Sequence, residues 1–201
     1  MRIFTPSISI RLVLCVLSLA VVTSCQRSSA SADNATSAPA AEPHYVPDAT
    51  IKDLMQSVVD TSADVVWLSV TTEVNEKGLI DTRPTNDEEW SRVRHGAVTL
   101  AEAANLLMIP GRHVARPGER SETPGVELEP EEMEVLINKD RGAWNTRATA
   151  LHDAAMLAVN AAEKHDADKI FEIGETIEQA CENCHRQYWY PNEKIPEPPK
   201  F

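Results

Sequence analysis

The chain has 201 residues, enough for one domain with a sizeable core. Its net charge of −12 argues against binding to nucleic acid, because the phosphates would be repelled. Aromatic residues make up only 5% of the chain. Its richness in Ala, Glu and Leu favours a helical protein.

Residues 1–24 have the features of an export signal. Arg2 and Arg11 flank a segment without acids, and the apolar run that follows is LVLCVLSLAVV. This run is shorter than the about 20 residues that a membrane-spanning helix needs. It has the length of the hydrophobic part of a signal peptide.

The sequence Val22-Thr-Ser-Cys25 resembles the lipobox of bacterial lipoproteins. This resemblance implies cleavage before Cys25, a lipid on its sulfur and therefore a membrane anchor. Gln26 follows instead of Asp, so the inner-membrane retention signal is missing and the outer membrane is favoured. The alternative is an ordinary secretory signal with a cysteine near its cleavage site.

The rest of the chain is predicted to contain three parts. Residues 25–47 are expected to be the lipidated cysteine and a flexible linker, because Ser, Ala and Pro dominate there and bulky apolar residues are rare. Residues 48–191 are expected to fold as one domain, and residues 192–201 form a Pro-rich tail.

Apolar residues at helical spacing predict four helices in this domain, at about residues 50–73, 85–109, 130–164 and 166–189. The first begins with a possible capping box, the second at a cap around Thr85, and the fourth at Asp166. No segment shows the alternation of a strand.

Two loops separate the predicted helices, one at residues 75–85 and a long crossover at residues 111–129. The third helix is long, and Gly142 is its expected bend. The predicted fold class is therefore all-α, an antiparallel up-down-up-down four-helix bundle preceded by a signal peptide and a flexible tether.

The motif Cys181-Glu-Asn-Cys184-His185 predicts a covalent haem site. Residues i, i+3 and i+4 share one face of a helix, so both thiols can form thioethers to haem vinyl groups while the imidazole approaches the iron. Residues such as Ile173 and Ile177 on this face would cover a porphyrin, and Gly174 would let a bulky group approach.

Three other chemistries use similar residues. A zinc site usually needs four ligands, and the other histidines provide no second pair: His44, His95, His113, His152 and His165. A thioredoxin-like pair expects a βαβ setting, which is not visible. A local disulfide would not require the adjacent histidine.

An exported helical domain with CENCH in its last helix and an aromatic residue at Tyr188 resembles the cytochrome c-prime group, the class II c-type cytochromes. The resemblance covers about residues 48–191. Its specificity comes from the position of the motif near the C-terminus. The YWYP sequence and the long loop after the first helix depart from the best-known members. The resemblance implies one haem c, with Cys181 and Cys184 binding the cofactor and His185 binding the iron.

Met55 is the predicted ligand on the other face of the iron. In an up-down-up-down bundle the end of the fourth helix lies beside the start of the first, and at 1.5 Å per residue His185 and Met55 lie at about the same height. The resemblance also implies that the first helix supplies this residue. Met108 and Met133 are expected at the same end. Without ligation by Met55, an open pocket would be lined by Val58, Val59 and Ser62.

Three functions follow. The first is single-electron transfer between redox partner proteins of the periplasm by a lipid-anchored protein. The second, implied by the resemblance, is binding or sensing of NO or CO by a five-coordinate iron. The third is a haem-free helical lipoprotein with a local disulfide. No enzymatic acid–base pair is apparent. Members of the group often form homodimers, and the sequence leaves the oligomeric state open.

Overall fold

The computed structural model describes residues 44–76 and 78–194. The predicted signal peptide, the lipidated Cys25, most of the linker and most of the Pro-rich tail lie outside the described residues.

The described chain is mostly helical, as predicted. Its first helical rod consists of α1 (Ile51–Leu54), the π-helical turn η1 (Met55–Val59) and α2 (Asp60–Trp67). The remaining helices are α3 (Asp87–Leu107), α4 (Pro130–Lys139), α5 (Arg141–Glu163) and α6 (Ala167–Tyr188). Two strands, β1 (Thr71–Asn75) and β2 (Gly78–Thr82), connect the first rod to α3.

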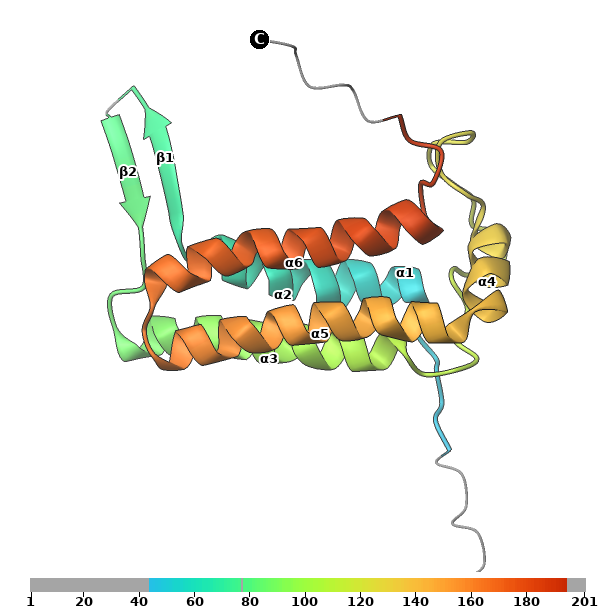
Figure 1. The fold of residues 1–201 in the computed structure, drawn as a ribbon, viewed down its shortest axis with the longest axis horizontal. Coiled ribbons are helices and arrows are strands. Elements are labelled where there is room, and N and C mark those ends of the chain that lie inside the picture. The colour runs from blue at the N-terminus through green and yellow to red at the C-terminus, as the bar shows by residue number, and fades with distance from the viewer. Residues whose placement is uncertain (1–43, 77, 195–201) are drawn as a thin grey trace, which may run out of the picture. The chain divides into compact units, whose positions relative to one another are not determined.

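Figure 1 shows the first rod, α3, α5 and α6 lying side by side, with the chain direction alternating from one to the next. The most extensive contacts are those of α3 with α5 and of α5 with α6, and α2 packs on both α3 and α6. The short helix α4 lies across the end at which α1 begins and α6 ends (Figure 1).

Side chains at the helix starts explain where the helices begin. In α1, Asp53 N donates to Thr50 Oγ1 and Thr50 N donates to Asp53 Oδ2, each at 3.0 Å, which confirms the predicted capping box. Asp166 Oδ1 caps α6 by accepting from Lys169 N at 3.0 Å. The cap of α3 is Asn86, one residue after the predicted Thr85, and it accepts from Glu89 N.

The prediction of no strands is wrong for residues 71–82. β1 and β2 pair antiparallel, with Val74 opposite Leu79 and Asn75 opposite Gly78, which has a φ of 111°. The first helix consequently ends at Trp67 and not near residue 73. Nearly every side chain of the hairpin is exposed, so no buried face imposed an alternating pattern on its sequence.

The predicted single helix 130–164 is also wrong, because it is divided at Asp140. This residue has a φ of −141° and a ψ of 77°, outside the helical region, and its side chain caps α5 by accepting from Ala143 N at 2.9 Å. The chain therefore changes direction two residues before Gly142, the expected bend, and α4 becomes a separate helix.

The core consists of two clusters of buried residues. The large cluster is rich in alanine and joins α2, α3, α5 and α6; its members include Ala63, Val66, Ala97, Leu100, Ala155, Ala158, Ile173 and Ile177. The small cluster lies where α1, α4 and the end of α6 meet, and comprises Ile51, Leu54, Leu107, Val114, Ile137, Trp144, Ala148 and Tyr188.

Candidate functional site

The CENCH motif lies in the last two turns of α6, at the junction of the two clusters. Cys181 packs against the large cluster and Cys184 against the small one. Both cysteines are free thiols, and both are partly buried, as is His185. The helix therefore presents two thiols and an imidazole to the interior on one face, as their spacing predicts.

Two neighbouring cavities, of about 290 Å³ and about 130 Å³, adjoin the motif. Cys181 lines the smaller one. Five residues line both: Met55, Asp60, Trp144, Cys184 and His185. The structure thus brings the four predicted residues of the domain around one pair of cavities, although they come from opposite ends of the sequence.

Met55 is the first residue of the π-helical turn, and its side chain contacts both clusters. After Leu54, the next buried residue of the rod is Val59, five positions later. In an α-helix, residues five positions apart are rotated by about 140° about the helix axis, so the two side chains would point to different sides of the rod. The wider π turn, in which Asp60 N donates to Met55 O, keeps both facing inward.

The other residues expected on the side of the iron opposite His185 do not all lie at the cavities. Met133 lines the larger cavity and Val59 lines the smaller one. Met108 lines neither; its sulfur lies 3.8 Å from Thr149 Oγ1. Val58 and Ser62 line neither cavity; Ser62 is buried, and its hydroxyl donates to the Val58 carbonyl within the rod.

Burial determines the protonation of the motif. It raises the pKa of Cys181 to about 12, with a further contribution from Glu178, and raises the pKa of Cys184 to about 11 against the opposing charge of Arg147. Both thiols are therefore protonated at neutral pH. A catalytic redox pair needs a lowered thiol pKa, so this site does not suit a thioredoxin-like reaction.

Burial lowers the pKa of His185, although Glu182, Asp60 and Glu178 oppose this effect. The imidazole is therefore neutral at neutral pH, with a lone pair available for a metal. Among residues 44–76 and 78–194, no three His, Cys, Asp or Glu side chains are grouped so as to hold a metal ion. Two thiols, a neutral imidazole and a nearby thioether fit a covalently held haem better than a zinc ion.

The group that approaches Gly174 is the indole of Trp67, not a prosthetic group. Trp67 Nε1 donates to the Gly174 carbonyl at 3.1 Å, and a Cβ at this position would lie 3.2 Å from Trp67 Cδ1. Trp67 also lines the smaller cavity. Gly174 thus leaves room for an indole that packs beside the site, which its position in the sequence did not reveal.

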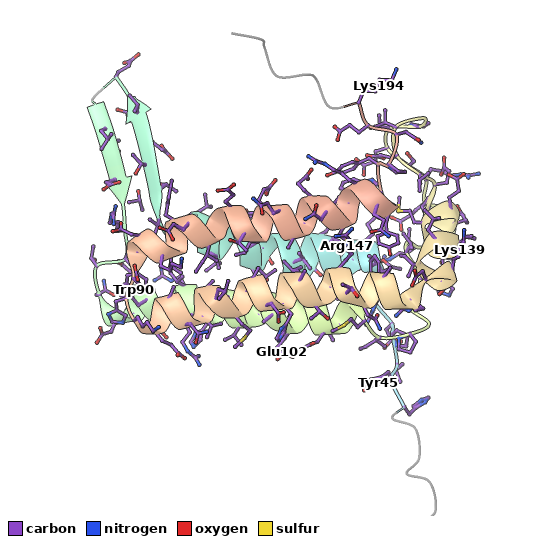
Figure 2. All side chains as sticks on the ribbon, viewed as in Figure 1. Tyr45, Trp90, Glu102, Lys139, Arg147 and Lys194 are labelled. Atoms are coloured by element: carbon purple, nitrogen blue, oxygen red, sulfur yellow. The ribbon has the colours of Figure 1, made fainter. Side chains whose placement is uncertain are left out.

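Several residues of the site were not expected from the sequence. Asp60 and Arg147 line the smaller cavity, and Arg147 Nε, between α5 and α6 in Figure 2, donates to Gln187 Oε1 at 3.0 Å. Trp189 and Tyr190 fold against the ring of His185. The unusual YWYP sequence was the one available signal for these two rings.

No protein-family model, curated protein or solved structure matches this chain. Within the part of the chain that the structure describes, no helix is both long and apolar enough to cross a membrane.

Proposed function

We propose that the chain is an exported monohaem c-type cytochrome of the cytochrome c-prime kind, folded as an antiparallel four-helix bundle, and that it transfers single electrons. One observation carries this proposal: Cys181, Cys184, His185 and Met55 adjoin the same two cavities. The motif would supply the covalent attachment, and apolar side chains such as Ile51 in the larger cavity and Leu151 in the smaller one would contact a porphyrin.

Each residue has a distinct role in this proposal. The thiols of Cys181 and Cys184 would hold the porphyrin through thioether bonds, each formed by adding S–H across a vinyl group without a leaving group. His185 would bind the iron with the lone pair of its neutral imidazole, and Met55 would offer its sulfur from the first rod. When bound, the haem supplies one-electron chemistry at an iron whose two ligands change little with oxidation state.

The proposed location is the periplasm, with the protein anchored to the outer membrane by a lipid on Cys25. Its partners would be redox proteins, and the net charge of −12 favours partners with a basic surface. Nucleic acid is not a proposed ligand.

A second candidate function, binding of NO or CO, is favoured by one observation. Val59 lines the smaller cavity together with His185 and Met55. If Met55 does not bind the iron, the face of the iron opposite His185 would be open to a gas molecule, with the apolar side chain of Val59 beside it. A third candidate, a haem-free lipoprotein with a local disulfide, would join two thiols that are free in the structure.

One experiment separates these functions. The full chain is expressed with the haem-attachment machinery, and visible spectra are recorded in both oxidation states with and without CO. Low-spin spectra that do not change with CO support electron transfer, whereas high-spin spectra that shift with CO support gas binding. A colourless product, or a denatured polypeptide without the added mass of haem, excludes both haem functions.

Met55→Ala tests the distal ligand. We expect a low-spin protein to become high-spin and to bind CO, because the substitution removes the sulfur that would complete the coordination of the iron. Met133→Ala is the matched control, since Met133 also lines the larger cavity. A spectral change in the control alone would assign the ligand to Met133.

A further inference from the structure

The chain turns back at the end of α6 and covers His185 with two aromatic rings. The backbone amides of Trp189 and Tyr190 both donate to the His185 carbonyl, at 2.7 and 3.0 Å. The ring centroids of His185 and Trp189 are 5.1 Å apart and perpendicular, and those of His185 and Tyr190 are 5.9 Å apart. The two rings therefore both contact the imidazole.

The crossover loop holds this turn in place. Leu128 N donates to the Trp189 carbonyl at 2.8 Å, and the rings of Trp189 and Tyr190 contact each other with centroids 5.2 Å apart. Residues from the loop and from the end of α6 thus fix the aromatic pair against His185.

Tyr190 also fixes a carboxylate beside the imidazole. Its hydroxyl donates to Glu182 Oε1 at 2.6 Å, while Arg186 lies 3.1 Å from Glu182 Oε2, so each carboxylate oxygen has its own partner. Glu182 precedes His185 by three residues on α6 and therefore shares its face. Its side chain is 29% exposed, against 49% for that of Arg186, so water screens the acid less than the base.

We propose that Glu182, held in position by Tyr190, lowers the reduction potential of an iron bound by His185. This inference rests on the proposed haem function. A fixed negative charge stabilises the oxidised iron, which carries one more positive charge than the reduced iron, and the electron lost on oxidation passes to a one-electron acceptor protein. Tyr190 is a positioning residue, because it acts through the carboxylate.

Three variants are expected to shift the reduction potential by amounts that differ in sign or in size. Glu182→Gln removes the negative charge and raises the potential. Arg186→Gln removes the partly compensating positive charge and lowers it. Tyr190→Phe releases the carboxylate into water, where screening is stronger, so the potential rises, but less than in Glu182→Gln.

The control variant is Glu175→Gln, which makes the same change in net charge on the same helix. Glu175 is exposed, pairs with Gln179 and lies about two turns before Glu182 on α6. We expect Glu182→Gln to change the ratio of reduced to oxidised protein, at a fixed applied potential, by on the order of tenfold, about 59 mV for a one-electron couple. Glu175→Gln should change it much less.

The measurement is a spectroelectrochemical titration of the full-length, haem-loaded protein, with spin state and thermal unfolding recorded for each variant. Equal shifts in Glu182→Gln and Glu175→Gln would overturn the inference. An unchanged potential in Tyr190→Phe would overturn the positioning role. Because these outcomes require a protein that carries haem, they are distinct from failure of the proposed function, in which no variant would be coloured.

Discussion

The two core clusters differ in how tightly they are packed, and the difference separates the scaffold from the site. The large cluster contains many alanines, and its helices approach so closely that a Cβ on Gly96 would lie 2.6 Å from Val65 Cγ1. The small cluster is built from larger side chains, among them Trp144 and Tyr188, and its residues border a cavity of about 290 Å³. Tight packing fixes the rods, while the looser end leaves space for a ligand.

The largest expected change in the free energy of unfolding comes from shortening one isoleucine in each cluster. Ile177 is 0% exposed in the large cluster, and Ile177→Ala should lower the free energy of unfolding by about 2–5 kcal/mol. Ile137 belongs to the small cluster and borders the larger cavity, so Ile137→Ala should cost less, because fewer contacts are lost there. Urea unfolding of both variants measures the difference, and equal losses would contradict the contrast in packing.

The next effect concerns the close approach of α2 and α3. Gly96→Ala should lower the free energy of unfolding by about 1–3 kcal/mol, because the new methyl group would displace Val65. Gly142→Ala is the matched control: its Cβ would meet only Asp140 Oδ1, at 3.4 Å, and it should stabilise by up to about 1 kcal/mol. Thermal unfolding that ranks the two in the opposite order would show that the rods can move apart.

The smallest effect is at the capping box beside the small cluster. Hydrogen bonds from the Thr50 backbone and side chain lower the pKa of Asp53, and Arg116 adds to this effect. A lowered pKa gives stability that is present above the unfolded pKa of about 3.9 and is lost as the pH falls through the folded value. The difference in stability between the natural protein and Asp53→Asn should therefore shrink below pH about 4. A difference that stays constant from pH 7 to pH 3 would exclude this role of the carboxylate.

The parts of the fold that short-range interactions control were predicted well. The capping box at Thr50 and the cap at Asp166 depend on residues three apart, so the sequence is sufficient to reveal them. The shared face of Cys181, Cys184 and His185 likewise follows from helical spacing. Met55 was expected near this end from helix direction and rise per residue, and it borders both cavities.

The parts that were missed depend on contacts between distant segments or on exposed backbone. The hairpin at residues 71–82 has no buried face to give a pattern, and the break at Asp140 replaces the expected bend at Gly142. The π turn at Met55–Val59 is a backbone adjustment to burial on both sides of it. Trp189 packs against His185, and its carbonyl accepts a hydrogen bond from Leu128 N, about 60 residues earlier in the chain.

The sequence by itself determined the helical character of the domain, the main helix starts and the face on which the two thiols and the imidazole lie, because each depends on periodicity or on neighbours within one turn. Only the tertiary structure decided which side chains complete the site. The cavities, the indole at Gly174 and the carboxylate fixed by Tyr190 arise where separate helices and loops pack together. Such contacts do not produce a regular spacing in the sequence, because the packing of separate helices and loops determines which residues become partners.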